Sequence, residues 1–536
     1  MLIHTFLACS ILAAITSAQC PPLHSGPDVT AGEITSIHYW GSVGGIGGYS
    51  LGVTACNIGN ANLPWSGTTD MHPVLSQSMY RLRDGRMQQI GTSFVSHGHS
   101  AIGQQLCCPC TQSGSLDLLG VGCSNSSTSS LNGDQAGSGL VGGLGPRSDI
   151  NASTGAFPFP YTSQGVGGNA IYKRLQVANA DLDPFLNAGA RYFVEALFVA
   201  PGDVALFNNA SYREAFVTTA AGGGFNMTVA GSVTERERAL QAWQGVDPSV
   251  TLFGLGLIFE GNYYLGSLCT DLGGGMWHYE YALFNENSHR SVRAFRVPLP
   301  PGTSLTNIEF VDVDYHSGEP YDGTDWAVAL TVTEIEWSTE TEAVNPNANA
   351  LRWGTTYNFA FDANVGPGDG EVDIGLFRAG TFDGFDIPCS VPEAPPCVAQ
   401  NYCSTSPNSN GAGAILSATG STSISANDFV LHASDASVNQ PGLFFYGPGQ
   451  IQVAFGNGFR CVGAGGTGIS RLNPPVTTDA AGDRSRALNY TLPPMDSGPG
   501  MITAGTSMNI QFWFRDPAGG GAGFNLSDGL RVTFCP

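Results

Sequence analysis

The chain has 536 residues, of which 12% are charged, and its formal net charge is −22. A chain of this length is expected to form roughly two to four domains, each able to bury its own core. The negative charge excludes nucleic acid as a partner and argues against anionic membrane surfaces, because no basic stripe is available to meet phosphates. The charge is compatible with calcium or another cation, or simply with solubility.

Residues 1–18 predict a signal peptide that is cleaved after Ala18. Their apolar run is too short to span a bilayer and ends in the small residues Thr16, Ser17 and Ala18. A buried N-terminal helix and a lipid anchor on Cys20 are the alternatives. No other stretch approaches about 18 consecutive apolar residues. We therefore expect no transmembrane anchor, and a protein that is secreted or held at the cell surface.

The rest of the chain predicts an all-β, multidomain fold, with β-sandwich modules stapled by disulfides and little helix. Short β-rich runs alternate with Gly, Pro, Asn and Asp throughout. Residues 19–245 predict a loop-rich N-terminal β domain. The best helical signal is at residues 234–243, where Thr234 and Glu237 have the spacing of a capping box.

Residues 246–388 predict a central β-sandwich. We place its strands at residues 250–258, 277–285, 290–297, 308–313, 326–337 and 355–361. A Pro-rich linker follows at residues 389–396, and its prolines favour an extended spacer. Residues 397–536 predict a C-terminal β-sandwich module.

The chain contains 13 cysteines, and one of them, Cys9, belongs to the predicted leader. The others form two even groups on either side of the linker, which indicates exported, disulfide-stapled modules. The groups are Cys20, Cys56, Cys107, Cys108, Cys110, Cys123, Cys269 and Cys389, and then Cys397, Cys403, Cys461 and Cys535. A Cys397–Cys535 bridge would clamp the ends of the last module and Cys403–Cys461 would be the second bridge, although other pairings are possible.

The last segment also carries several motifs in a fixed order. They are Asn401-Tyr-Cys-Ser, Pro441-Gly-Leu-Phe-Phe-Tyr-Gly447, Gly458-Phe-Arg-Cys-Val462, Phe512-Trp-Phe-Arg-Asp-Pro517 and Asn525-Leu-Ser-Asp-Gly-Leu530. This set resembles a C-terminal module that is common in large secreted proteins of planctomycete-type bacteria. The middle of the chain is similar to another recurring part of these proteins, at residues 270–282, 285–288 and 312–321. The resemblance implies secretion and β-modules, and it carries over no catalytic residue.

The densest cluster of candidate metal ligands combines three histidines, His72, His97 and His99, with the cysteines at 107, 108 and 110. His97 and His99 have the i, i+2 spacing that places both rings on one face of a strand. Two such histidines and a distant third can build a copper or zinc site. The alternative is that the cysteines form disulfides and the histidines are loop or surface residues, which an oxidising compartment favours.

Acidic residues cluster in the central segment, at Asp312, Asp314, Glu319, Asp322 and Asp325. Several hard oxygens from flexible loops can bind calcium, although this run lacks the pattern of the helix-loop-helix calcium loop. Calcium is therefore the one cofactor that the sequence suggests. The alternative is a set of solvated turn carboxylates.

Asp271 and Glu280 flank an aromatic run at residues 277–281, which predicts either a strand with one buried aromatic face or a platform for sugars. The nucleophile elbow, the zinc-protease motif and the Walker A loop are all absent from the sequence. We therefore expect a secreted, non-enzymatic surface or matrix protein whose modules bind cell-envelope material or glycans. The alternatives are a secreted copper or zinc enzyme that uses the N-terminal histidines, and a carbohydrate-binding or glycoside-active domain around residues 271–281.

Overall fold

The computed structural model of the protein describes residues 24–135, 143–258, 260–314, 316–393 and 397–535. These residues confirm the all-β prediction, because they form antiparallel sheets and only three short α-helices. Within the described ranges, no helix is long and apolar enough to cross a membrane. The predicted signal peptide and Cys20 lie outside the described residues.

The described residues form two compact units. The first runs as far as Val391, apart from two short segments, Leu299–Ser304 and Asn364–Gly368. The second comprises these segments and the chain from Pro392 onward.

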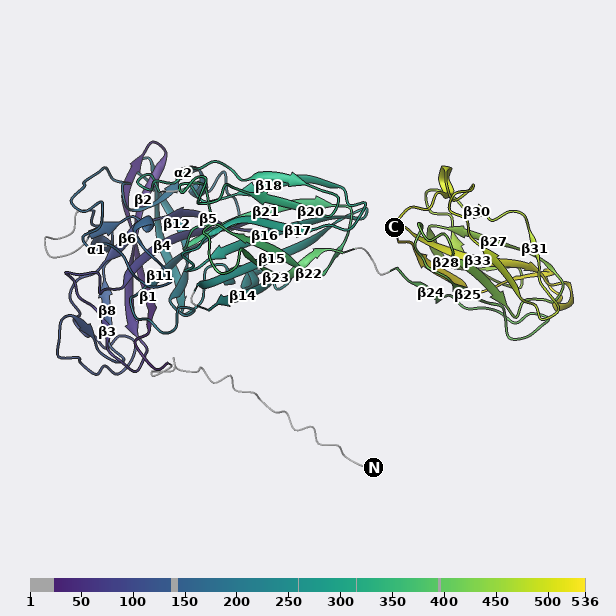
Figure 1. The fold of residues 1–536 in the computed structure, drawn as a ribbon, viewed down its shortest axis with the longest axis horizontal. Helices are drawn as coiled ribbons and strands as arrows, with labels where there is room; N and C mark the ends of the chain where they lie inside the picture. Colours follow the sequence, from purple (N-terminus) through teal and green to yellow (C-terminus); the bar gives the residue numbers. More distant parts are fainter. Residues whose placement is uncertain (1–23, 136–142, 259, 315, 394–396, 536) are drawn as a thin grey trace, which may run out of the picture. The chain divides into compact units, whose positions relative to one another are not determined.

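The first unit begins with a large antiparallel sheet, drawn in purple and blue in Figure 1. Its main strands, in spatial order, are β1 (Val29–Val43), β2 (Ile46–Asn57), β10 (Leu175–Ala178), β5 (Arg86–Thr92), β4 (Val74–Arg83), β11 (Arg191–Val199), β12 (Ala210–Ala221) and β13 (Gly224–Thr234). The short strands β6 (Val95–His97), β8 (Ser124–Ser127) and β9 (Gly143–Gly145) extend it, and β3 (Leu63–Pro64) pairs separately with β7 (Leu118–Leu119).

Local sequence explains how this sheet starts. Val43 pairs with Ile46, so Gly44 and Gly45 alone connect β1 to β2. Both glycines have positive φ, of 61° and 85°, which the tightest hairpin turns require and side chains disfavour. β4 and β11 carry apolar side chains on both faces, because each contributes to two hydrophobic cores.

The helix predicted at residues 234–243 is shorter and begins later. The three helices are α1 (Ser129–Asn132), α2 (Asn179–Leu182) and α3 (Gln241–Val246). Thr234 ends β13 by pairing with Tyr212, so it caps no helix. Arg236 has a φ of 62°, which breaks the helical path, and Gln241 accepts a hydrogen bond from the Arg238 N–H at 2.7 Å. Tertiary pairing therefore overrides the capping-box pattern.

The rest of the first unit is a sandwich of two five-stranded sheets. One sheet contains β14 (Thr251–Leu257), β15 (Gly261–Gly273), β16 (Met276–Asn285), β21 (Thr355–Ala363) and β18 (Leu305–Val311). The other contains β19 (Ala327–Leu330), β20 (Glu334–Ser338), β17 (Val292–Pro298), β22 (Pro367–Leu376) and β23 (Gly384–Pro392). Aromatic rings fill the space between them: Phe295 stacks on Phe359 at 4.2 Å, and Trp337 packs beside both.

The strand predicted at residues 326–337 is in fact a hairpin. β19 pairs back onto β20, with Leu330 opposite Ile335. The hydroxyl of Thr331 accepts hydrogen bonds from the backbone N–H groups of Thr333 and Glu334 at 3.2 and 3.1 Å, which closes the turn. The branched residues that favoured one long strand are compatible with two short ones.

The large sheet and the sandwich share one core, in spite of the domain boundary predicted at residues 245–246. Tyr80 and Phe193 from the large sheet lie in the same buried cluster as Trp243, Phe284 and Trp353. Buried polar contacts cross the same seam: the Thr356 N–H donates to the Gln89 side chain at 2.7 Å, and the Asn358 amide donates to the carbonyl of Met87 at 3.0 Å. These elements therefore form one folding body.

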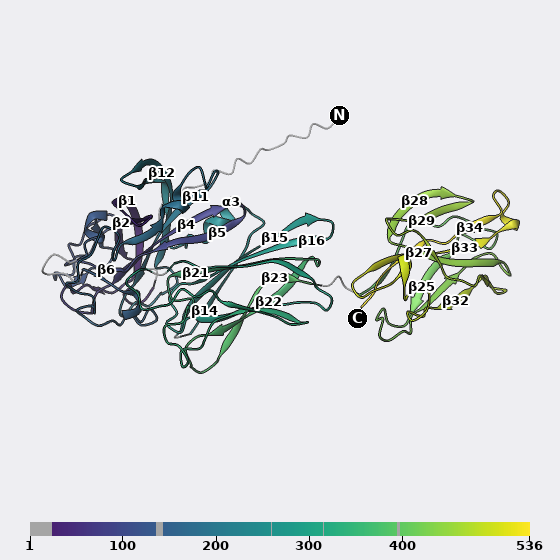
Figure 2. The same ribbon diagram turned by 90° about the horizontal axis from the view of Figure 1, so that it is seen from above.

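The second unit is a sandwich with an additional hairpin. Its larger sheet contains β24 (Ala399–Tyr402), β35 (Gly529–Thr533), β33 (Ser507–Arg515), β27 (Pro441–Gly447) and β30 (Ser470–Arg471), with β31 (Val476–Thr477) and β34 (Phe524–Leu526) attached. Its smaller sheet contains β25 (Ile415–Thr419), β26 (Val430–Ser434) and β32 (Arg484–Ala487). The hairpin is β28 (Gly449–Phe455) and β29 (Gly458–Gly463). Figure 2 shows this hairpin on one side of β27 and β33, with β25 and β32 on the other.

The disulfides staple each unit separately. The structure joins Cys397 to Cys535 and Cys403 to Cys461 in the second unit, and Cys56 to Cys107 and Cys110 to Cys123 in the first. Cys108 is also disulfide-bonded. Cys269 and Cys389, which the even count placed among the disulfide cysteines, are instead free thiols. β23 continues to Pro392, so the first residues of the predicted linker lie in a strand.

Candidate functional site

The histidines predicted as metal ligands lie at one end of the large sheet. His97 ends β6, and His72 precedes β4, which pairs with β6. Their rings stack at 4.2 Å, and the aromatic side chains of Trp65 and Phe159 pack against them. Both histidines are buried. The structure therefore stacks His97 on His72, whereas the sequence paired His97 with His99 and left His72 as a distant third histidine.

The surroundings of this pair do not suit a metal. The two ring nitrogens of His72 lie 2.6 Å from the carbonyl oxygen of Pro73 and 3.3 Å from that of His99. Those of His97 lie 3.1 Å from the carbonyl oxygen of Gly98 and 2.9 Å from that of Thr69. Burial lowers the pKa of His72 to about 3 and also lowers that of His97, so both rings are neutral near pH 7.

Among the described residues, no three His, Cys, Asp or Glu side chains are close enough together to hold a metal ion. The predicted copper or zinc site at His72, His97 and His99 therefore has no ligand set in this part of the chain. The neighbouring cysteines cannot complete one, because Cys107, Cys108 and Cys110 are all in disulfides. The rings instead tie the loops around Thr69 and Gly98 to the sheet.

A cleft opens beside this pair of histidines, with a volume of about 260 Å³. Small-molecule sites usually start near roughly 300 Å³, so this cleft has room for a ligand about the size of one sugar. Its walls come from β2, β8 and the loops around His72 and His99. The lining residues are Ala55, Trp65, His72, Pro73, Leu75, Ser96, Gly98, His99, Ser100, Ile102, Asn125, Ser126, Ser127, Leu131, Asn132 and Phe198.

The surface of the cleft is mostly apolar, with several uncharged polar side chains. Its lining contains serine and asparagine side chains beside Trp65, Phe198 and Ile102, and includes no Asp, Glu, Lys or Arg. Hydroxyl and amide groups donate and accept hydrogen bonds, and aromatic and aliphatic surfaces suit the C–H faces of a ligand. A pair of carboxylates for hydrolysis is missing from the lining. The arrangement can bind a neutral polyol, and the only side chains of the lining that could act as an acid or base are His72 and His99.

Two disulfides hold the loop that borders the cleft. Cys56–Cys107 ties the middle of the loop to β2, Cys110–Cys123 ties it to the residue before β8, and the Asn125 side chain accepts a hydrogen bond from the Ile102 N–H at 3.0 Å. The cleft is therefore preformed. Sequence reasoning missed Trp65, Asn125 and Ser126, because the only signal was the Ser- and Asn-rich composition of this region.

Three of the acidic residues predicted for calcium bind separate hydrogen-bond donors. Asp312 accepts a hydrogen bond from the Asn349 amide at 2.5 Å, and burial raises its pKa to about 6. Glu319 accepts from the Arg147 N–H at 2.6 Å, and Asp322 accepts from the Thr324 N–H and the Asn345 amide. The remaining two, Asp314 and Asp325, are exposed. These carboxylates satisfy turns and N–H groups, so they form no calcium site within the described ranges.

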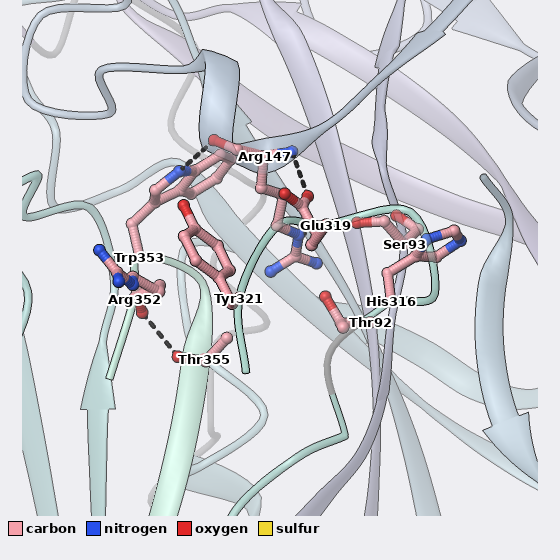
Figure 3. Close-up of a pocket in the computed structure, with 9 residues that line it drawn as sticks. All are labelled: Thr92, Ser93, Arg147, His316, Glu319, Tyr321, Arg352, Trp353 and Thr355. Atoms are coloured by element: carbon pink, nitrogen blue, oxygen red, sulfur yellow. Dashed lines mark hydrogen bonds between the residues drawn. The ribbon is translucent and has the colours of Figure 1, made fainter. Parts of the chain in front are cut away.

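Glu319 belongs instead to a small buried cavity at the seam between the large sheet and the sandwich, which Figure 3 shows. The cavity has a volume of about 10 Å³, roughly that of one water molecule. Arg147 crosses it and donates to the carbonyl oxygens of Ser93, Gly354 and Gln77 at 2.8, 2.8 and 2.9 Å. The Trp353 indole donates to the Arg147 carbonyl at 3.1 Å. This cluster joins the two parts of the unit and has no room for a substrate.

The aromatic run at residues 277–281 lies in β16, which is half-buried at Trp277 and His278 and buried from Tyr279 onward. Tyr279 and Tyr281 are fully buried, and the Tyr281 hydroxyl donates to the Ser390 carbonyl at 2.8 Å. Glu280 pairs with Arg86 of the large sheet at 2.6 Å, and Asp271 accepts from the Gly273 N–H at a turn. Residues 271–281 therefore offer neither an exposed tyrosine surface for a sugar nor a free pair of carboxylates for glycoside hydrolysis.

The fold and its clefts define a disulfide-bonded, multi-sandwich all-β protein. No protein-family model matches the chain, and no curated protein matches its sequence. Three solved structures are similar to parts of it. The fimbrial adhesin FimA of Actinomyces shares 12% identity, covering 54% of this chain and 98% of its own, with a TM-score of 0.14.

A tetra-tandem repeat from the extending region of a large adhesion protein shares 8% identity, covering 96% of this chain and 100% of its own, with a TM-score of 0.15. The RrgB pilus protein of Streptococcus pneumoniae shares 9% identity, covering 68% of this chain and 52% of its own, also with a TM-score of 0.15. Superpositions this poor carry no argument about function.

Proposed function

We propose that the protein is a secreted, non-enzymatic attachment protein of the cell surface or extracellular matrix, and that its N-terminal cleft binds a neutral sugar of the cell envelope or of another glycan. The observation that supports this proposal is the uncharged cleft of about 260 Å³, with serine and asparagine side chains beside an aromatic wall. The cleft is rigid and lacks the paired carboxylates of glycosidases. Binding without turnover is the activity that fits it best.

Export is part of the same proposal. Disulfides persist in oxidising compartments, and the described residues contain four complete bridges. The leader at residues 1–18 would deliver the chain to that compartment. We also propose that the second unit is the accessory module that it resembles in planctomycete-type secreted proteins.

The test is sugar binding by the full chain, produced in an oxidising compartment. A neutral glycan array followed by calorimetry on the best binder measures affinity. Ser100 is exposed and lines the cleft, so Ser100→Trp fills the cleft without disturbing the core. We expect this variant to weaken binding at least about tenfold, equivalent to about 1.4 kcal/mol.

Ser115→Trp is the matched control, because Ser115 is exposed in the same disulfide-held loop and lies outside the cleft. It should bind like the unmodified protein. The proposal fails if no neutral glycan binds, or if both tryptophan variants bind equally well. Release of reducing sugar from the bound glycan would instead point to an enzyme.

A further inference from the structure

A second groove lies on the outer face of the larger sheet in the second unit. Side chains alternate along its strands: Phe444 of β27 and Phe512 of β33 point into the sandwich core, whereas Phe445 and Trp513 belong to a separate cluster on the opposite face. The hairpin β28–β29 lies over this outer face (Figure 2). The groove has a volume of about 350 Å³ and is lined by Leu443, Phe445, Phe455, Arg460, Ile469, Arg471, Trp513 and Leu526.

Aromatic rings form one wall of the groove. Trp513 lies 5.8 Å from Phe524, and Phe524 lies 5.3 Å from Phe455, measured between ring centroids. Phe455 is 47% exposed, which is unusual for a phenylalanine. The faces of such rings pack well against the C–H groups of a sugar ring.

Two cations complete the lining, Arg460 and Arg471, and no carboxylate accompanies them. Within the described residues, neither arginine takes part in an ion pair. The Nε of Arg460 is buried and has no hydrogen-bond partner. A buried donor of a charged group is costly to leave unsatisfied, so the groove is complementary to an anion. This arrangement stands out in a chain with 43 acidic residues and only 21 basic ones.

The groove is held open by contacts that do not involve its ligand-facing side chains. Cys403–Cys461 ties β29 to the segment after β24, and the Tyr402 hydroxyl donates to the Cys461 carbonyl at 2.8 Å. Gln511 of β33 accepts from the Cys461 N–H at 2.9 Å and donates to the Phe459 carbonyl at 2.8 Å. The site is therefore preorganised, which reduces the entropy lost on binding.

We propose that this groove binds an acidic polysaccharide that contains uronic acid, with its carboxylates held by Arg460 and Arg471 and a sugar ring packed on Trp513. The planar guanidinium fork matches a carboxylate, and a uronic acid carries its carboxylate directly on the ring. A peptide cannot add a strand to β27 or β33, because each of these is already paired on both sides. The site lies in a different unit from the N-terminal cleft, so the inference does not depend on the proposed neutral-sugar site.

The probe is oligogalacturonate, titrated into the full chain by calorimetry at two salt concentrations. Its methyl ester is the neutral control, since it keeps the sugar rings and removes the charge. We expect oligogalacturonate to bind, its affinity to fall with salt, and its methyl ester to bind at least tenfold more weakly.

Substitutions of the two groove arginines test whether oligogalacturonate binds in the groove. Arg460→Gln and Arg471→Gln should each weaken binding at least tenfold. Arg484→Gln should leave it unchanged, because Arg484 is exposed on β32 of the opposite sheet. Arg471 is also exposed, so its variant keeps the test valid if Arg460→Gln fails to fold.

The proposal is overturned if oligogalacturonate does not bind, if the groove variants bind it as well as Arg484→Gln does, or if its methyl ester binds equally. Binding of dextran sulfate alone, or of an acidic peptide alone, also overturns it. Loss of neutral-sugar binding in Ser100→Trp should leave oligogalacturonate binding intact, which separates this site from the N-terminal one.

Discussion

Glu195 is a buried carboxyl group in the middle of β11, where it accepts a hydrogen bond from the Ala239 N–H at 2.8 Å. Burial raises its pKa to about 7, from an ordinary value of 4.5. The folded state therefore keeps this proton up to about pH 7, whereas the unfolded state releases it near pH 4.5. The stability that Glu195 contributes is present below pH 4.5 and is lost as the pH rises through 7.

Glu195→Gln removes this titration and keeps the acceptor for Ala239. We expect the free energy of unfolding of the variant, relative to that of the unmodified protein, to rise by at most about 3 kcal/mol between pH 5 and pH 8. Its melting temperature should rise accordingly. Thermal unfolding at several pH values measures it. The exposed Glu340→Gln is the control and should show no such trend. A constant difference between Glu195→Gln and the unmodified protein across this range would contradict the assignment.

Residues such as Glu195 and Arg147 were not predictable from the sequence. The residues next to each of them in the sequence give no sign of a role, because their hydrogen-bond partners lie far away along the chain. Glu195 accepts from Ala239, and Arg147 donates to Gly354. The sequence grouped His72 with His97 and His99, but it did not show that the His72 ring stacks on the His97 ring. It also did not show that both rings are buried beside backbone carbonyl groups, which decide their chemistry.

Local patterns predicted most elements and failed where pairing competes with propensity. Strands expected at residues 277–285 and 355–361 appear as β16 and β21, since their aromatic residues face a buried core. The helix expected from residue 234 is mostly strand and turn, because Thr234 pairs with Tyr212. The first and last motifs of the C-terminal segment meet in the structure, where the Asn401 amide donates to the Asp528 carboxylate at 2.7 Å.

The strands β15 and β23 carry the two free thiols, Cys269 and Cys389. Cys269 pairs directly with the buried Tyr279 across the ladder, so both side chains lie on the core face. Burial raises the pKa of each thiol to about 12, and the charge of Cys269 contributes to the shift at Cys389. Since the thiolate is the reactive form, both groups should be unreactive in the folded protein.

We expect alkylation of the native protein at pH 8 to be slow, and alkylation after denaturation without reductant to label two thiols per chain. Peptide mapping should place the labels on Cys269 and Cys389. Cys269→Ser should lower the count to one. Rapid labelling of the native protein, or the absence of thiols after denaturation, would show that these strands are arranged differently or that the two sulfurs are bonded.

At the scale of the whole molecule, a Pro-rich segment and a separate group of cysteines mark the part of the chain that forms most of the second unit. The boundary predicted at residue 245 does not separate two hydrophobic cores. Trp243 before it and Phe284 after it share one core, and Arg86 pairs with Glu280 across the same seam. The prediction of this boundary followed a change in composition along the chain, whereas the buried core contains side chains from both sides of it.

Fragments of the chain test this division. Residues 392–536 contain a complete hydrophobic core, from Leu416 to Phe534, and both Cys397–Cys535 and Cys403–Cys461. We expect this fragment to unfold in one cooperative thermal transition and to form both disulfides by mass spectrometry, because closing the long loop of Cys397–Cys535 restricts the unfolded chain. Residues 19–245 should behave differently, because this fragment keeps Tyr80 and Trp243 but loses Phe284 and Trp353, which cover them. It should aggregate or lack a cooperative transition, whereas residues 19–391 should fold.

A cooperative transition in the fragment 19–245, or a fragment 392–536 that is disordered, would show that the hydrophobic cores are divided in another way.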